Sequence, residues 1–126
     1  MADRRILIID DASLVRFYYR DALERVGYAV DEAMNGLEAL EKLLVKPVDL
    51  LIVDINMPKM DGLTFLRTLR RQPLPLGGTP AIVISTESSP KDNAAARAAG
   101  ANFYLVKPVA QDALIRYVGM LCGLPE

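Results

Sequence analysis

The sequence predicts an α/β domain in which five parallel strands form one sheet with helices on both faces. Short apolar runs alternate along the chain with segments whose apolar residues recur with helical spacing. Three of the runs are continuous stretches of isoleucine, leucine and valine, which is typical of strands buried on both sides of a parallel sheet. Successive parallel strands need helical crossovers, and right-handed crossovers place helices on both sides of the sheet.

The expected strands differ in how deeply they should be buried. They span residues 5–10, 29–33, 50–54, 81–85 and 102–106. The runs "RILIID", "LLIVD" and "AIVIS" are apolar until a polar residue ends them, so we expect them in the middle of the sheet. The run "AVDEA" alternates weakly and is expected nearer an edge, and "NFYLV" is the last strand.

One helix is expected after each strand. The expected helices span residues 13–26, 36–45, 63–71, 90–99 and 110–121. The first, second and last have apolar stripes at helical spacing, and Gly27 and Pro47 follow the first two as stop signals. The third follows Asp61, a candidate N-cap, and the fourth begins with Pro90 and ends before Gly100. The loop at residues 71–80 connects two such units, so residues 1–126 are expected to form a single domain.

Composition and charge narrow the class of protein. An apolar share of 52% with 25% charged residues is that of a globular protein. A net charge of −1 without a block of basic residues gives no sign of direct nucleic-acid binding. The first apolar stretch is too short for a signal peptide or a membrane span, and Cys122 is the single cysteine. We therefore expect a cytoplasmic location and no membrane insertion.

The sequence has no histidine, which restricts the available chemistry. Histidine-based general base catalysis, Ser-His-Asp triads and most zinc sites are excluded. The chain also cannot form a phosphohistidine of its own. Its chemistry must therefore use carboxylates, hydroxyls, lysine or a hard cation.

Polar side chains stand at the ends of four expected strands. The first ends in Asp10 and is followed by Asp11, Asp54 ends the third, Ser85 ends the fourth, and Lys107 follows the fifth. Because ligands of open α/β sheets bind at the carboxyl ends of the strands, we expect these side chains in one crevice. Read alone, each has an ordinary role as well: the adjacent aspartates could cap the first helix, and the lysine could be solvated.

Clustered carboxylates need a positive partner. At about 4 Å and an effective dielectric of ~20, each like-charge pair costs on the order of 4 kcal/mol. One lysine cannot offset Asp10, Asp11 and Asp54 together, so a hard divalent cation, Mg²⁺, is expected among them. Mg²⁺ shares its ligand shell with phosphate, and a carboxylate can accept a phosphoryl group as the nucleophile. Asp54 is the candidate nucleophile because it stands alone at the end of a central strand.

Several motifs together resemble the receiver domain of two-component response regulators, most closely the single-domain, CheY-like chemotaxis type. The motifs are "IIDDAS" (8–13), "VDINMPKMDG" (53–62), "ISTE" (84–87), "AAGAN" (98–102) and "YLVKP" (104–108). The resemblance covers essentially the whole chain and implies a flavodoxin-like (βα)5 fold with strand order 2-1-3-4-5. It implies a phosphorylation-dependent signalling switch, with self-phosphorylation and slow autodephosphorylation, and not a turnover enzyme.

The resemblance also implies a role for each site residue. Asp54 would be the phosphoacceptor, and Lys107 would pair with the phosphoryl group. Asp10 and Asp11 would hold Mg²⁺ together with Asp54 and the backbone carbonyl of Asn56.

Three further positions bear on switching. Ser85 takes the position of the switch hydroxyl, and Tyr104 takes that of the aromatic residue whose rotamer follows phosphorylation, although a tyrosine alone is more often a packed core residue. The peptide bond between Lys107 and Pro108 is expected to be cis.

Thr86 departs from the family, which usually has alanine or glycine there. Because threonine is larger, we expect slower loading from small phosphodonors and slower self-hydrolysis.

The resemblance implies partners too. A histidine kinase would donate the phosphoryl group, and a target protein would bind the face formed by the fourth helix, the fifth strand and the fifth helix. A phosphatase is an additional candidate partner, and the flagellar motor is a candidate target. The chain would be a monomer or a weak dimer. A phosphate sink, a relay receiver and a receiver fragment of a larger regulator are alternative roles.

Two other classes of protein fit less well. A phosphatase with an aspartate nucleophile typically needs a second acid two residues after it, where this chain has Asn56. A nucleotide-binding module of the flavodoxin type would show a glycine-rich phosphate-binding fingerprint after a strand, and none occurs.

Overall fold

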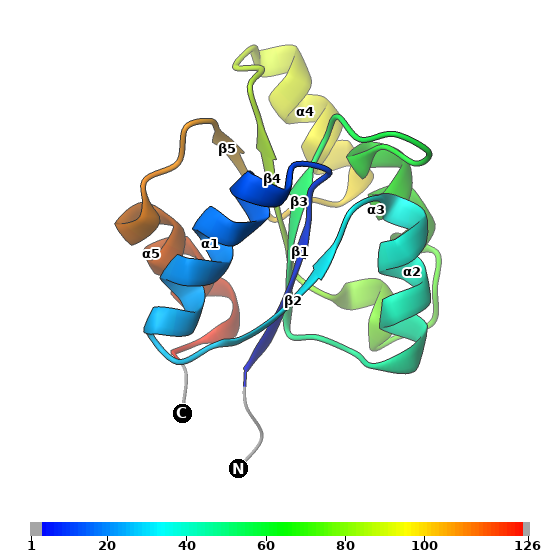
Figure 1. Cartoon of the computed structure of the whole chain (residues 1–126). Helices are drawn as coiled ribbons and strands as arrows, with labels where there is room; N and C mark the ends of the chain where they lie inside the picture. The colour runs from blue at the N-terminus through cyan, green and yellow to red at the C-terminus, as the bar shows by residue number, and fades with distance from the viewer. Residues whose placement is uncertain (1–3, 125–126) are drawn as a thin grey trace.

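Five parallel strands form one sheet in the computed structural model, which describes residues 4–124 (Figure 1). The strands are β1 (Arg5–Ile9), β2 (Ala29–Ala33), β3 (Leu50–Asp54), β4 (Ala81–Ser85) and β5 (Phe103–Val106). Their order is β2-β1-β3-β4-β5 and every pairing is parallel, as the resemblance implied. The weakly alternating run "AVDEA" is indeed an edge strand. The predicted single domain spans residues 1–126, of which residues 1–3 and 125–126 lie outside the part that the structure describes.

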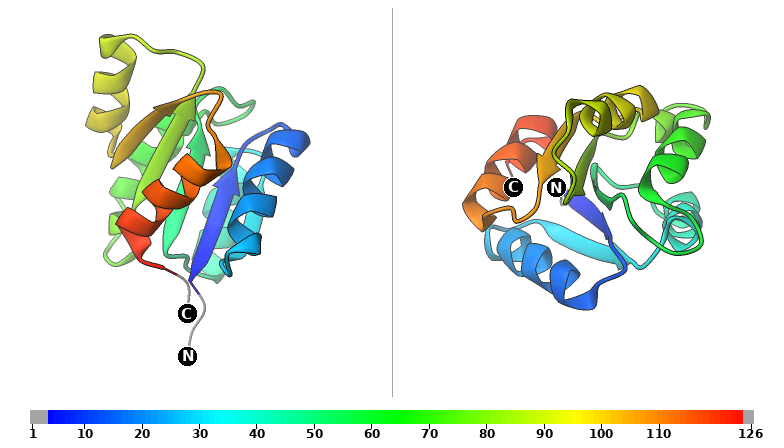
Figure 2. Two further views of the ribbon diagram at one scale, coloured as in Figure 1. Left: turned by 90° about the vertical axis from the view of Figure 1, so that its left-hand side faces the viewer. Right: turned by 90° about the horizontal axis from the view of Figure 1, so that it is seen from above.

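Helices cover both faces of the sheet (Figure 2). They are α1 (Ser13–Arg25), α2 (Gly36–Val45), α3 (Gly62–Arg70), α4 (Pro90–Ala99) and α5 (Gln111–Cys122), and a short 3₁₀ helix, η1, spans Leu76–Gly78. Helices α1 and α5 pack on one face, and α2, α3 and α4 pack on the other. Every predicted element is present, with ends that agree to within one residue, whereas η1 was not predicted. No helix within residues 4–124 is both long and apolar enough to cross a membrane.

The continuous apolar runs are explained by two separate cores. In β1, Leu7 and Ile9 pack with α2, α3 and α4, while Ile6 and Ile8 pack with α1 and α5. All four side chains are completely buried. Each buried leucine or isoleucine contributes about 1.5–3 kcal/mol relative to an exposed one. Both sides of a central strand must therefore be apolar, which is why β1, β3 and β4 do not alternate.

The register of the sheet brings the carboxyl ends of the strands together. Ile9 of β1 lies beside Val53 of β3, and the next residue of β3, Asp54, lies beside Ile84 of β4. Ser85 in turn lies beside Val106 of β5. The polar residues that end or follow these strands therefore meet at one edge, which is the upper edge of the sheet in Figure 1.

Candidate functional site

Three aspartates form an acidic cluster at the carboxyl edge of the sheet. Asp10, Asp11 and Asp54 each place a carboxylate oxygen within 4.8 Å of those of the other two. Asp10 and Asp54 are buried, with 2% and 5% of their surface exposed, and Asp11 is exposed. The predicted convergence of these three acids is thus confirmed by the coordinates.

The backbone fixes two of these acids firmly. The Asp10 N–H donates to the Ala33 carbonyl at 3.1 Å, and its side chain accepts from the Ala12 N–H at 2.9 Å. Asp54 is the last residue of β3. Gly62, the first residue of α3, lies so close to Asp54 that a Cβ there would stand 2.3 Å from the Asp54 carbonyl oxygen. A glycine is therefore required where α3 begins against the end of β3.

Lys107 places a positive charge beside two carboxylates of the cluster. Its Nζ lies 3.2 Å from Asp54 Oδ1, to which it donates a hydrogen bond, and 3.5 Å from Asp10 Oδ2. The Lys107 N–H donates to the Ser85 carbonyl at 2.7 Å, which ties it to the end of β4. The peptide bond between Lys107 and Pro108 is cis, as expected.

The electrostatics of the cluster show an excess of negative charge. Burial, and then the charge of Asp10, raise the pKa of Asp54 above its ordinary value, although Lys107 opposes the shift. Burial and the charges of Asp10 and Asp54 likewise raise the pKa of the Tyr19 phenol. Several carboxylate oxygens around a single lysine are the donor set that a hard cation such as Mg²⁺ prefers. The residues present therefore fit a divalent cation held by Asp10, Asp11 and Asp54.

Ser85 and Tyr104 are connected through one residue of the loop after β4. Ser85 is completely buried, and its Oγ accepts a hydrogen bond from the Glu87 N–H at 3.1 Å. The Tyr104 hydroxyl donates to the Glu87 carbonyl at 2.6 Å. Ser85 and Tyr104 were predicted from the sequence, but Glu87 was not. Glu87 contributes its backbone N–H and carbonyl, so the type of its side chain gives no indication of this role.

Asn56 lies in the loop that follows β3, and its side chain is exposed. The predicted ligand is the backbone carbonyl of Asn56, so the exposure of the side chain does not test it. The role of Asn56 in binding Mg²⁺ stays a prediction.

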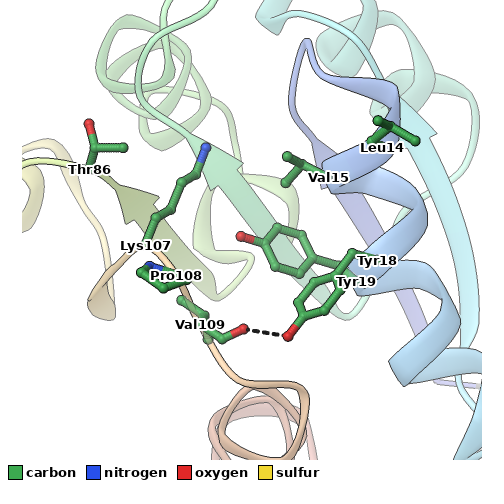
Figure 3. A pocket seen from close by; sticks show the side chains of 8 residues that line it. All are labelled: Leu14, Val15, Tyr18, Tyr19, Thr86, Lys107, Pro108 and Val109. Atoms are coloured by element: carbon green, nitrogen blue, oxygen red, sulfur yellow. Dashed lines mark hydrogen bonds between the residues drawn. The ribbon is translucent and has the colours of Figure 1, made fainter.

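An apolar cavity lies beside Lys107 and was not predicted. It measures about 470 Å³ and lies between the start of α1 and the segments that follow β4 and β5 (Figure 3). Its lining residues are Leu14, Val15, Tyr18, Tyr19, Thr86, Lys107, Pro108 and Val109. The Tyr18 hydroxyl donates to the Val109 carbonyl at 3.1 Å across its lower part. Thr86 is exposed and lines the cavity on the same side as Lys107 (Figure 3).

Comparisons with known proteins show which family the chain is similar to. The family model of the response regulator receiver domain matches residues 6–119. The chain is 34% identical over 116 residues to the CAI-1 autoinducer sensor kinase/phosphatase CqsS of Vibrio cholerae and 36% identical over 118 residues to the sensor protein EvgS of Escherichia coli. Each match covers 92% of this chain but only 17% and 9% of those longer proteins. Among solved structures, chemotaxis protein CheY4 of Vibrio cholerae superposes with a TM-score of 0.89 at 33% identity, covering 95% of this chain and 99% of that one.

The acidic cluster predicts that Asp54→Asn stabilises the metal-free protein at neutral pH. Since folding raises the pKa of Asp54, the folded state holds this proton more tightly than the unfolded state, and stability falls as pH rises from about 3.8 through the raised pKa. Asparagine removes this loss. We expect a gain of about 1 kcal/mol or more at pH 7, because a like-charge pair at this separation costs between ~1 and ~4 kcal/mol.

Urea unfolding in EDTA between about pH 4 and pH 7.5 measures this effect. The gain should shrink toward the acidic end. Asp112→Asn, which removes an exposed acid from the first turn of α5, is the matched control and should give no gain. Equal stability of Asp54→Asn and the unmodified protein at pH 7 would contradict the electrostatic account.

Proposed function

The chain belongs to the response regulator receiver domain family of two-component signalling, and we propose that it is a phosphorylation-dependent switch whose phosphoacceptor is Asp54. The observation that supports this best is the placement of the Asp54 carboxylate, 3.2 Å from Lys107 and within 4.8 Å of the Asp10 and Asp11 carboxylates. Receiver domains are signalling switches and not turnover enzymes. Consistent with this, Asn56 stands where a phosphatase with an aspartate nucleophile would have its second acid.

The proposed reaction is transfer of a phosphoryl group to Asp54. A carboxylate oxygen of Asp54 attacks phosphorus, the phosphorus–nitrogen bond of a phosphohistidine donor breaks, and the electron pair stays on the donor imidazole. Lys107 faces the oxygens of the transferred group with its ammonium charge, which lies beside Asp54 already. Bound by Asp10, Asp11, Asp54 and the Asn56 carbonyl, Mg²⁺ would supply the remaining positive charge that the acids and the phosphoryl oxygens need.

The proposed switch runs from Asp54 to Tyr104 through Ser85 and Glu87. The Ser85 Oγ only accepts in its bond with the Glu87 N–H, so its own proton is available for a phosphoryl oxygen. Moving this hydroxyl toward Asp54 would release the Glu87 amide, and the Glu87 carbonyl is the acceptor of the Tyr104 hydroxyl. The face of α4, β5 and α5, where we propose that the target protein binds, would change with Tyr104.

The proposed donor is a histidine kinase, because receiver domains accept phosphate from such kinases and this chain has no histidine. A phosphatase that removes the phosphoryl group from Asp54 is a further proposed partner. A cytoplasmic location and a monomeric or weakly dimeric state are proposed on the same basis. The second candidate function is a relay receiver or a receiver segment of a larger regulator, since the chain spans 17% and 9% of two sensor proteins that it resembles.

Incubation with acetyl phosphate and Mg²⁺ should add the mass of one phosphoryl group to the intact protein. Asp54→Ala should gain none, because the carboxylate that accepts the hydrogen bond from Lys107 is then absent. Mass spectrometry of the intact chains measures this. Asp112→Ala, which removes a distant exposed acid, is the control and should be labelled normally. A full mass shift in Asp54→Ala would show that the acceptor lies elsewhere.

Thr86→Ala should speed both phosphorylation by acetyl phosphate and loss of the phosphoryl group. Thr86 lines the cavity beside Lys107, so a smaller side chain leaves more room for a small phosphodonor or water there. We expect a change of up to about tenfold, equivalent to ~1.4 kcal/mol of barrier. Time courses of intact mass give both rates. Thr68→Ala, at a half-buried position of α3 that does not line the cavity, serves as the control. Unchanged rates in Thr86→Ala would rule out an effect of Thr86 on access.

Ser85→Ala should uncouple the site from Tyr104. With Mg²⁺ and beryllofluoride as a phosphoryl mimic, the unmodified protein should show amide chemical-shift changes both near Asp54 and at Glu87 and Tyr104. In Ser85→Ala only the changes near Asp54 should remain, because the hydroxyl that moves is absent. Ser88→Ala removes an exposed hydroxyl of the same loop and should behave as the unmodified protein. Full changes at Tyr104 in Ser85→Ala would contradict the proposed route.

A further inference from the structure

One arginine of α1 contacts the backbone of the acidic cluster. The Arg16 Nη1 donates to the carbonyl oxygen of Asp10 at 2.6 Å. Its Nε donates to the Glu32 carboxylate at 2.8 Å. Only 15% of the arginine side chain is exposed. A single guanidinium therefore connects α1, the segment after β1 and the edge strand β2.

Glu32 is itself held in place from several directions. Its other carboxylate oxygen accepts from Arg20 Nη1 at 2.5 Å, and the Lys42 ammonium donates to its backbone carbonyl. Burial raises the pKa of Glu32, but the hydrogen bonds from Arg20 and Arg16 outweigh this and leave the pKa below its ordinary value. Glu32 is therefore an ionised and fixed anchor for Arg16.

The N–H of Asp10 is still bonded to Ala33 of β2, whereas Arg16 contacts the Asp10 carbonyl, on the side where the chain leaves the sheet for α1. The pairing of β1 with β2 ends at Ile9, so Asp10 and Asp11 lie on the segment that leaves the sheet for α1. A hydrogen bond from a charged donor to a carbonyl is stronger and more directional than one from a neutral donor. Arg16 therefore limits the rotation of the Asp10–Asp11 peptide, and with it the direction of both carboxylates.

We propose that Arg16, anchored by Glu32, is a positioning residue that presets Asp10 and Asp11 for a divalent cation. The inference rests on the proposed function, since it concerns the acids of the same site. Arg16 is not itself a ligand and touches no reacting atom. Its effect is exerted through the backbone of Asp10, in the way that outer-shell partners orient metal ligands.

The positive charge of Arg16 makes it possible to separate an electrostatic effect on Mg²⁺ affinity from a positioning effect. A cation near acidic ligands opposes the binding of a second cation, so if charge were its only influence, removing Arg16 would strengthen Mg²⁺ binding. If Arg16 positions the acids, its removal would weaken Mg²⁺ binding, because the Asp10 and Asp11 carboxylates could then rotate away from the cation. The two explanations therefore predict shifts of Mg²⁺ affinity in opposite directions.

The experiment is an Mg²⁺ titration of the unphosphorylated protein, followed by amide chemical shifts around Asp10 and Asp54. Arg16→Met should raise the dissociation constant by about tenfold or more, which is the size of effect that outer-shell partners of metal ligands have. Arg16→Lys keeps the charge but cannot span Asp10 and Glu32 with a planar fork, so it should also bind more weakly. Arg20→Met is the matched control: it removes the other arginine of Glu32, makes no contact with Asp10, and should leave the affinity within about twofold.

The outcomes separate the inference from the proposed function. Mg²⁺ affinity that is unchanged or higher in Arg16→Met would overturn the positioning role, and so would equal weakening in Arg20→Met. If Arg16→Met does not give a folded spectrum, Arg16→Lys decides by the same criterion. A failure of the unmodified protein to bind Mg²⁺ would overturn the proposed metal site together with this inference. Normal binding and phosphorylation of the unmodified protein, with no effect of Arg16→Met, would overturn the inference alone.

Discussion

The repulsion among three carboxylates is the interaction on which the site depends. Asp10, Asp11 and Asp54 would separate if the chain were free, yet their oxygens lie within 4.8 Å of one another. They stay together because β1 and β3 are neighbouring parallel strands whose side chains fill two apolar cores. The free energy of burying those side chains offsets the electrostatic cost. Lys107 offsets that cost only in part. The site therefore retains excess negative charge, which a bound cation can neutralise.

The same geometry connects the acids to the surface. Ser85 and Lys107 lie on neighbouring strand ends and share a backbone hydrogen bond, and the Lys107 ammonium also donates to Asp54. Glu87 then joins Ser85 to Tyr104 through its N–H and its carbonyl. A switch of this kind needs only a small difference in free energy between two arrangements of one loop and one aromatic side chain. The rest of the sheet can remain fixed.

The sequence predicted those parts of the fold and the site in which the position of a residue restricts which residue types can occupy it. The uniform burial of β1, β3 and β4 requires continuous apolar runs, and the strand order and the convergence of Asp10, Asp54 and Lys107 follow from the parallel arrangement and the family resemblance. Contacts between distant segments were not predictable in the same way. Arg16 and Glu32 are each ordinary charged residues in sequence, and only the packing of α1 beside β2 brings them together. The cavity beside Lys107 likewise depends on how α1 lies against the segment after β5. Glu87 acts through its backbone, which its side chain does not reveal.

We propose that one pocket at the carboxyl edge of the sheet holds a cation and a phosphoryl group on Asp54. A crystal structure of the protein grown with Mg²⁺ and beryllofluoride tests it most directly. We expect beryllofluoride bonded to an Asp54 oxygen, Lys107 and Ser85 in contact with its fluorines, and Mg²⁺ coordinated by Asp10 or Asp11 together with Asp54. Beryllofluoride or Mg²⁺ bound only at other positions, with Asp54 still paired to Lys107 alone, would contradict it.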